Sequence, residues 1–295
     1  MGGKVIFSNI TGSYVFDSNA NVIDKSDDKN GLIKKYKKLS EPSPKELFNI
    51  MKQFKNRQYF SKFYSENLKL TKRLVKDSVS PDLFVEQSIN LIQEIDKVAN
   101  LLVKRLREWY AYPAPEFVES VEDHEMFVKL IIEGRPKIVE QGMGAELAKE
   151  DIEPMVALAK EVAGLYSLRA KEETYLKKLM EKIAPNVNEV AGSLIGAKLI
   201  DHAGGLKRLA LMPASTIQLL GAEKALFRHM KTGARCPKYG LLLNHPIVSS
   251  AGTEKGKAAR SVSDKISIAA RVDFYKGKFV GDQLKKELEQ RFKKR

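Results

Sequence analysis

The longest regular stretch of the chain reads DIEPMVALAKEVAGLYSLRAKEETYLKKLMEKI, from Asp151 to Ile183. Its apolar residues alternate steps of three and four, which is the spacing of a helix that packs along another helix. The positions of this seam are Ile152, Met155, Ala159, Val162, Tyr166, Arg169, Glu173, Leu176, Met180 and Ile183. Arg169 and Glu173 interrupt the apolar run and are expected to fix its register. The stretch therefore predicts one long coiled-coil helix.

A second helix with coiled-coil spacing is predicted to begin at Ser80-Pro81 and to end at Tyr112-Pro-Ala-Pro115, because proline starts helices well and breaks them inside. Its expected buried stripe is Phe84, Ser88, Leu91, Ile95, Val98, Leu102, Arg105 and Trp109. Together the two helices predict an antiparallel hairpin. Its seam is satisfied either within the chain or in a dimer, and spacing does not decide between these.

The N-terminal residues 4–24 alternate in polarity and are rich in β-formers, with Gly, Asn and Asp at the breaks. They predict two or three short strands. Ser43-Pro44 then caps and opens a helix. Phe60, Phe63 and Tyr64 are interpreted as core residues. This region is therefore expected to be a small α+β domain.

Near the C-terminus, the run GAEKALFRHMKTG at residues 221–233 predicts a short helix that stops at Gly233. One face carries three cations, Lys224, Arg228 and Lys231. The neighbouring face carries three apolar residues, Leu226, Phe227 and Met230, which are expected to dock on a core. The backbone amides at the helix N-terminus add positive potential. The stretch suits a phosphate backbone.

Charge is distributed unevenly over the 295 residues, whose net charge is +14. Residues 186–295 hold 21 basic and 9 acidic residues, whereas residues 81–185 hold 14 and 20. This asymmetry indicates polyanion binding at the C-terminal end. The chain has one cysteine, Cys236, and no apolar run of about 18 residues. These features favour an intracellular protein without a membrane span.

Catalytic motifs are missing from the sequence. The run GTEKGKA at residues 252–258 lacks the spacing and the Ser/Thr of a phosphate-binding loop. The four histidines show no short metal-ligand spacing, and there is no G-x-S-x-G. Nothing in the sequence therefore argues for an active site or a metal site, and the family resemblance described below implies a non-catalytic protein that binds no cofactor.

The expected fold class is mainly α. It combines a small α+β N-terminal domain over residues 1–80, a long antiparallel helical coiled coil over residues 81–184, and an all-α C-terminal domain over residues 185–295.

Several separate motifs stand in one order through the C-terminal part. They are Ala184-Pro-Asn186, Gly196-Ala-Lys-Leu-Ile200, His202-Ala-Gly204, Leu209 to Met212, Pro213-Ala-Ser-Thr-Ile-Gln218, the run at residues 221–229, and Pro237-Lys-Tyr-Gly240. In this order they closely resemble the Nop domain of box C/D ribonucleoprotein scaffold proteins. The close resemblance covers roughly residues 184–275.

The resemblance implies a scaffold that binds kinked guide RNA together with a small kink-turn-binding protein. It also implies that the N-terminal domain holds fibrillarin, a methyltransferase that uses S-adenosylmethionine for guided 2′-O-methylation of rRNA or tRNA. Relatives associate through the helical middle, so a homodimer formed through the seam is the preferred interpretation. The compact form looks archaeal, which implies a cytoplasmic protein, or a nucleolar one in a eukaryote.

Candidate site residues follow from the motifs. Phosphate contacts are expected from Lys224, Arg228, Lys231, Arg235, Lys238 and Arg260. Base or partner contacts are expected from Gln218, Glu223 and His229, with Gly221 and Ala222 supplying the helix N-terminus. Methyltransferase contacts are assigned to the N-terminal aromatic residues Phe7, Tyr14, Phe16 and Phe48.

Two rival functions stay open at this point. A splicing-factor relative would use the same domain on spliceosomal small nuclear RNA, although the absence of long tails counts against it. An enzyme acting on RNA is disfavoured by the missing catalytic motifs.

Overall fold

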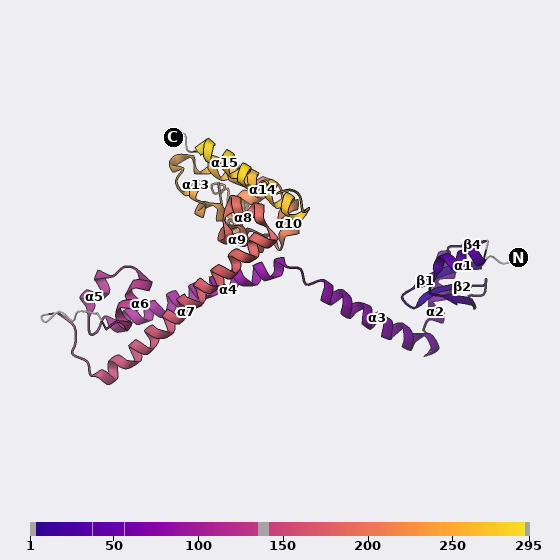
Figure 1. The fold of residues 1–295 in the computed structure, drawn as a ribbon, viewed down its shortest axis with the longest axis horizontal. Coiled ribbons are helices and arrows are strands. Elements are labelled where there is room, and N and C mark those ends of the chain that lie inside the picture. Colours follow the sequence, from indigo (N-terminus) through magenta and orange to yellow (C-terminus); the bar gives the residue numbers. More distant parts are fainter. Residues whose placement is uncertain (1–3, 37, 56, 135–141, 293–295) are drawn as a thin grey trace. The chain divides into compact units, whose positions relative to one another are not determined.

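The computed structural model describes residues 4–36, 38–55, 57–134 and 142–292 (Figure 1). The chain forms two compact units, Met1–Ser80 and Pro81–Arg295. Helices dominate both units and strands occur only in the first, within the described residues. The fold is therefore mainly α with a small N-terminal sheet, as the sequence predicts.

The first unit is built on a four-stranded sheet in the order β3-β2-β1-β4. Three strands form an antiparallel meander and the fourth pairs in parallel with β1. The elements are β1 (Lys4–Asn9), β2 (Gly12–Phe16), β3 (Val22–Ser26), α1 (Lys29–Lys35), β4 (Leu39–Ser40), α2 (Pro44–Gln53) and α3 (Arg57–Asp77). The predicted strands are present, and β4 is an addition that two residues of sequence do not signal.

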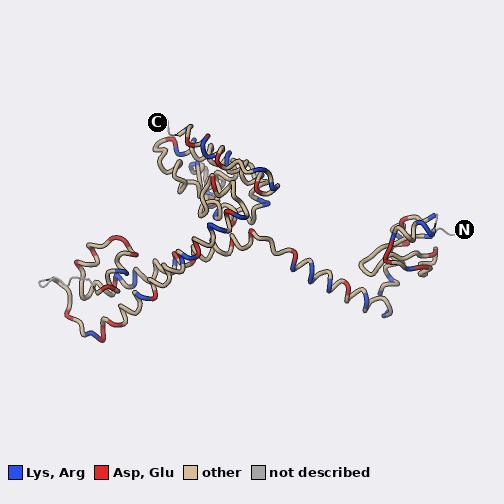
Figure 2. Tube along the Cα trace, viewed as in Figure 1, with Lys and Arg blue, Asp and Glu red and all other residues tan. Residues whose placement is uncertain are grey.

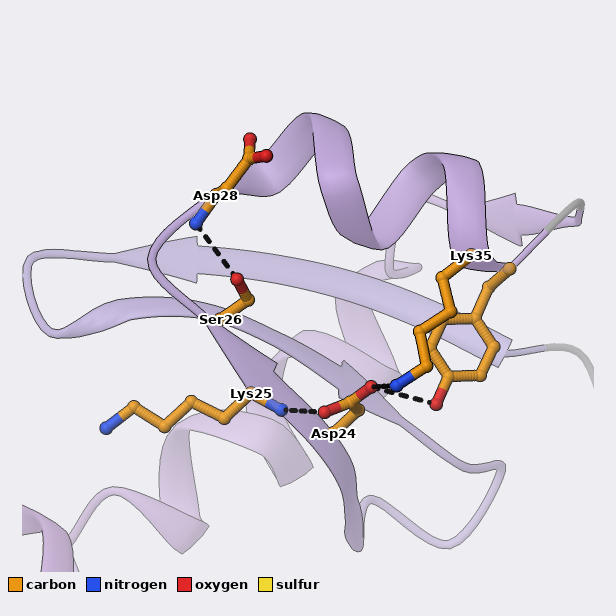
Figure 3. Close-up of polar contacts among 6 residues, drawn as sticks. Asp24, Lys25, Ser26, Asp28 and Lys35 are labelled. Atoms are coloured by element: carbon orange, nitrogen blue, oxygen red, sulfur yellow. Dashed lines mark hydrogen bonds and ion pairs between the residues drawn. The ribbon is translucent and has the colours of Figure 1, made fainter.

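Local side-chain contacts fix the first two helices that follow the meander, α1 and α2. Ser43 and Glu46 form a reciprocal capping box at the start of α2, which confirms the predicted start at Pro44. The Asp24 carboxylate on β3 accepts hydrogen bonds from Lys35 Nζ at 2.7 Å and from Tyr36 Oη at 3.0 Å (Figure 3). The hydrogen bond from Lys35 is the main cause of a lowered pKa for Asp24. This carboxylate therefore ties the C-terminal end of α1 to the sheet.

The core of the first unit corrects two sequence-based interpretations. Tyr14 and Phe16, assigned to methyltransferase contacts, are 1% and 0% exposed and pack on Phe54. They are core residues, because the inner face of the sheet needs large apolar side chains to bury. Conversely, Phe60 and Tyr64, interpreted as core, are more than half exposed on α3. The exposed aromatic surface of this unit is helical.

The second unit begins with a hairpin of two long helices, α4 (Asp82–Tyr110) and α7 (Lys149–Ile183), which lie side by side (Figure 1). Two short helices, α5 (Pro115–Ser120) and α6 (His124–Ile132), lie between them in sequence. The α7 seam is buried at Met155, Ala159, Val162, Leu176 and Met180, and half-buried at Ile152, Tyr166 and Arg169. Arg169 pairs with Asp96 of α4 at 2.5 Å.

The seam is therefore satisfied within one chain, and its interpretation as the dimer interface is wrong. A second copy cannot reach side chains that α4 and α6 of the same chain already cover. Burial of this apolar seam is what joins the two long helices into a hairpin.

The buried stripe of α4 is also shifted from its predicted register. Its buried residues are Val85, Ser88, Ile89, Ile92, Ile95, Ala99, Val103, Leu106 and Tyr110. Three residues assigned to the stripe, Phe84, Leu91 and Val98, are instead 50%, 38% and 46% exposed. They recur every seven residues and so form a second, outward-facing apolar line on the same helix.

The remaining helices pack into an all-α bundle. They are α8 (Pro185–Ala191), α9 (Ser193–Ala203), α10 (Leu206–Leu211), α11 (Ala214–Leu219), α12 (Glu223–Thr232), η1 (Leu241–Asn244), α13 (Pro246–Ser249), η2 (Gly252–Glu254), α14 (Lys255–Phe274) and α15 (Gly281–Phe292). The apolar side of α14 is buried at its centre. One hydrophobic core joins these helices to the base of the hairpin, including Ile89 and Met180. The predicted boundary after residue 184 thus falls inside a packed unit.

A buried polar network locks the bundle. Asp273 of α14 accepts hydrogen bonds from the backbone amides of Asn186 and Val187 at 3.1 and 2.8 Å. The Asn186 side chain donates to the same carboxylate and accepts from the Val280 amide at 2.7 Å. Burial raises the pKa of Asp273, and these donors partly oppose that effect. The network satisfies the first amides of α8, which would otherwise be orphaned.

Candidate nucleic-acid interface

Helix α12 is the element around which the candidate interface is built. Gly221, in the turn before it, has φ +84°, and a Cβ there would lie 2.6 Å from Leu241 Cγ. Gly233 ends the helix in the left-handed conformation with φ +67°, as predicted. Two glycines at opposite ends therefore set where this helix starts and stops.

The three predicted cations of α12 are all exposed. Lys224, Arg228 and Lys231 project from one side of the helix and take part in no ion pair with another described residue. An unpaired surface cation does not have to break an existing bond before it meets a phosphate. The structure thus provides the cationic face that the spacing predicts.

The apolar side of α12 differs from the prediction. Phe227 and Met230 are 59% and 70% exposed, and no residue of the helix is fully buried. Of the residues of α12, only Leu226 and His229 are half-buried. The helix therefore presents an apolar strip beside its cationic strip. The spacing of residues in the sequence does not reveal that the apolar strip is exposed, because an apolar stripe on a helix usually faces a core.

Three polar residues expected at a base or partner are engaged inside the domain. Gln218 is only 9% exposed, and its Nε2 donates to the Lys238 carbonyl at 2.5 Å. The ring Nδ1 of His229 is bonded to the Ala234 carbonyl. Gln218 is therefore not an RNA contact, since a buried amide with an internal partner cannot reach a base.

Glu223 is the third of these residues. Its Oε1 accepts a hydrogen bond from the Gly221 amide at 2.7 Å and lies 3.7 Å from Nδ1 of His202 on α9. Partial burial acts to raise the pKa of Glu223, but the Gly221 bond and His202 outweigh it, so the net shift is downward. An ionised carboxylate is thus kept at the helix N-terminus, where the helix dipole stabilises it.

The segment after α12 carries further cations. Arg235 and Lys238 are exposed, and so is Arg260 on α14. The alkyl chain of Lys238 lies against Gly256, where an added Cβ would be 3.5 Å from its Cδ. Arg260 follows Gly256 by four residues and so sits one turn further on the same side of α14. Lys238 therefore lies beside α14, the helix that carries Arg260.

Figure 2 shows Lys and Arg distributed along these C-terminal helices. Among the described residues, no group of His, Cys, Asp and Glu side chains is arranged to hold a metal ion. Over the same ranges, no helix is long and apolar enough to span a bilayer. The chemical property of the candidate interface is therefore its positive charge, which can bind a polyanion.

Fold and surface together define a class of protein: a helical hairpin that carries an all-α domain with an exposed cationic helix. The chain matches the family model described as "Nop: snoRNA binding domain, fibrillarin" over residues 91–294. Because that match covers more than half of its length, the chain belongs to the Nop family.

Individual relatives agree with this assignment. The chain is 38% identical over 273 residues to a NOP5 family protein of Methanocaldococcus jannaschii, covering 83% of this chain and 66% of that protein. It is 40% identical over 215 residues to nucleolar protein 58 of Schizosaccharomyces pombe, covering 65% of this chain and 42% of that one. The chain therefore spans less than two thirds of these relatives' length. A chain from the crystal structure of a fibrillarin/Nop5p complex aligns over 98% of both chains with a TM-score of 0.49 and 24% identity.

Replacing Arg228 with alanine tests the cationic face. Arg228 is exposed and its planar guanidinium can make two parallel bonds to a phosphate. We expect the variant to stay folded and to lose about 1–3 kcal/mol of RNA-binding free energy. The salt dependence should flatten by about one counterion.

The measurement is titration of the RNA complex at several salt concentrations. Lys177→Ala, an exposed cation of α7 outside the interface, is the matched control and should leave affinity and slope unchanged. Unchanged affinity in Arg228→Ala would place the RNA site elsewhere.

Proposed function

We propose that the chain is the non-catalytic scaffold of a box C/D small ribonucleoprotein, which binds guide RNA and recruits a 2′-O-methyltransferase. The observation that carries this proposal is the exposed cationic face of α12, which lies within the residues that match the Nop family model and forms no ion pair with another described residue. Relatives named nucleolar proteins 56 and 58 support a ribonucleoprotein context.

RNA recognition would be led by the backbone and would depend on RNA shape. The candidate phosphate contacts are cations, and the three polar residues expected at a base or partner, Gln218, Glu223 and His229, each make a hydrogen bond within the protein. Phosphate contacts position a protein on a nucleic acid but carry no sequence information. A kinked RNA, with phosphates brought together by its bend, suits such a surface.

A small kink-turn-binding protein is the proposed second component. The exposed Phe227 and Met230 adjoin the cations of α12, so one helix offers charge to RNA and apolar area to a partner. Large exposed apolar side chains beside polar ones are typical of interaction surfaces. A complex of RNA with this small protein would cover the cationic strip and the apolar strip of α12 at once.

The proposed methyltransferase site lies in the first unit. Of the four aromatic residues assigned to it, Phe48 is 62% exposed and Phe7 is half-buried. The helices also expose Met51, at 56%, and a stacked pair, Phe60 and Tyr64. We therefore place the contact on α2 and α3 rather than on the inner face of the sheet.

Self-association is proposed through the outer face of the hairpin. Leu168 and Tyr175 of α7 are 41% and 45% exposed and are also seven residues apart. Tyr175 lines a shallow groove together with Phe84 and Leu91 of α4. One groove is thus bordered by members of both outward-facing apolar lines together with polar residues, which suits a second hairpin packed against it.

A splicing-factor role is the alternative that uses the same surface. It differs in the RNA, since a spliceosomal small nuclear RNA would replace the guide RNA. Comparing the affinities of the two RNAs, each carrying the kink-turn protein, distinguishes the two functions.

Reconstitution tests the proposed function. The chain, a box C/D guide RNA, the kink-turn protein and fibrillarin should together methylate a complementary RNA when S-adenosylmethionine is supplied. Mass spectrometry of the target RNA reports the methyl group. Methylation by the chain and S-adenosylmethionine alone would contradict the scaffold role and favour an enzyme.

A variant with Phe48, Phe60 and Tyr64 changed to alanine separates the two ends of the scaffold. All three side chains are more than half exposed, so the unit should remain folded. Assembly with RNA should persist while capture of the methyltransferase and methylation are lost. Full capture by this variant would remove α2 and α3 from the contact.

The dimer interface is tested by Leu91→Asp combined with Val98→Asp. Both side chains face outward, so the hairpin should keep its helix content while the dimer dissociates. Leu176→Asp is the contrasting control, because an unpaired charge at a fully buried position should unfold the hairpin. Light scattering and circular dichroism measure the two effects. A dimer of wild-type affinity in the double variant would exclude this face.

A further inference from the structure

Three polar residues of the α12 region each make a hydrogen bond to the backbone of their own chain. Gln218 precedes the helix, Glu223 begins it, and His229 lies in its last turn. Each is bonded to a backbone group of an adjacent segment, although the Glu223 side chain also remains 48% exposed. We call these three residues the frame. Their hydrogen-bond partners are backbone groups in the turn before α12 or in the segment after it.

Glu223 fixes the turn before the helix. Its bond to the Gly221 amide holds a residue whose positive φ only glycine adopts readily. The same turn is paired with the chain beyond α12, since the Leu241 amide donates to Leu220 O at 2.8 Å and the Gly240 amide donates to Gln218 O at 3.0 Å. We expect the orientation of α12 to depend on this short, hydrogen-bonded turn.

Gln218 and His229 fix the segment after the helix. Gln218 holds the carbonyl of Lys238, and His229 holds the carbonyl of Ala234. Arg235 follows the first of these two carbonyls and Lys238 carries the second, and both are candidate phosphate ligands. The frame therefore constrains both groups of cations, those on α12 and those that follow it, relative to one another.

Electrostatics favours a structural role for Glu223 over a direct contact with RNA. A carboxylate inside a cationic surface repels phosphate, and a direct contact with RNA would bring that repulsion closest. Its short bond to an amide of its own chain gives it a function that needs no RNA. Ordering flexible groups on binding lowers affinity, and a preformed backbone reduces that loss.

We propose that Gln218, Glu223 and His229 are positioning residues that preorganise the α12 surface for phosphates, and that they do not contact RNA. This rests on the proposed RNA-binding function. The frame sets the geometry, and Lys224, Arg228, Lys231, Arg235 and Lys238 make the contacts.

The test compares Glu223→Ala with Glu223→Gln. Alanine removes the acceptor for the Gly221 amide, so RNA affinity should fall by about 2- to 10-fold, the worth of one hydrogen bond. The slope of affinity against salt should not change, because no cation is lost. Glutamine keeps an acceptor oxygen and removes the negative charge, so it should bind at least as tightly as the wild type.

A readout without RNA separates positioning from contact. Hydrogen exchange of the Gly221 amide, followed by NMR in the free protein, should be fast in Glu223→Ala and slow in the wild type and in Glu223→Gln. His229→Ala should likewise weaken RNA binding without a change in salt slope.

Either of two results would overturn the proposal. One is Gly221 exchange in Glu223→Ala that matches the wild type. The other is a Glu223→Gln variant as weak as Glu223→Ala although its Gly221 amide is protected, which would mean that RNA or a partner needs the charge itself. If the wild type fails to bind RNA, the proposed function fails, while the exchange measurement still tests the frame.

Discussion

Burial of the α7 seam against α4 is the interaction on which the second unit depends. Leu176 and Met180 are fully buried at the base of the hairpin and belong to the same hydrophobic core as the C-terminal helices. Because one core serves both parts, the hairpin and the all-α domain share their stabilising contacts. Satisfying the seam inside one chain also leaves a different face of the hairpin, the line of Phe84, Leu91 and Val98, free for a second copy.

The same division between buried and free groups organises the candidate RNA surface. Gln218, Glu223 and His229, which were expected at a base or partner, bond the backbone, whereas the α12 cations form no ion pair with another residue that the structure describes. Such a surface has its electrostatic contacts prepared before RNA arrives, which suits recognition of shape. In the interior of the domain, the Asp273 network likewise fixes the backbone, since it holds α8, α14 and the start of α15 together.

Much of the fold follows from local sequence patterns. The heptad spacing of α7, the capping box at Ser43 and the stop at Gly233 are set by neighbouring residues, so the sequence predicts them. The sequence does not predict which residues of α4 are buried, because apolar residues at heptad spacing stand both on its buried face and on its outer face. Tyr14 and Phe60 were misassigned for a similar reason, because an aromatic residue of a core and one of a partner surface cannot be told apart by sequence alone. Hydrogen bonds such as Gln218 to Lys238 join positions twenty residues apart, and no local pattern signals them.

Lysine acetylation, read by mass spectrometry in the free protein and in the RNA complex, tests the central claim most directly. Lys224, Lys231 and Lys238 are exposed and should lose reactivity when RNA binds, whereas the exposed Lys72 of α3 and Lys177 of α7 should keep theirs. The account predicts protection confined to α12, the segment that follows it and the adjoining face of α14. Full reactivity of the α12 lysines in the complex, with protection on α3 or on the hairpin instead, would contradict it.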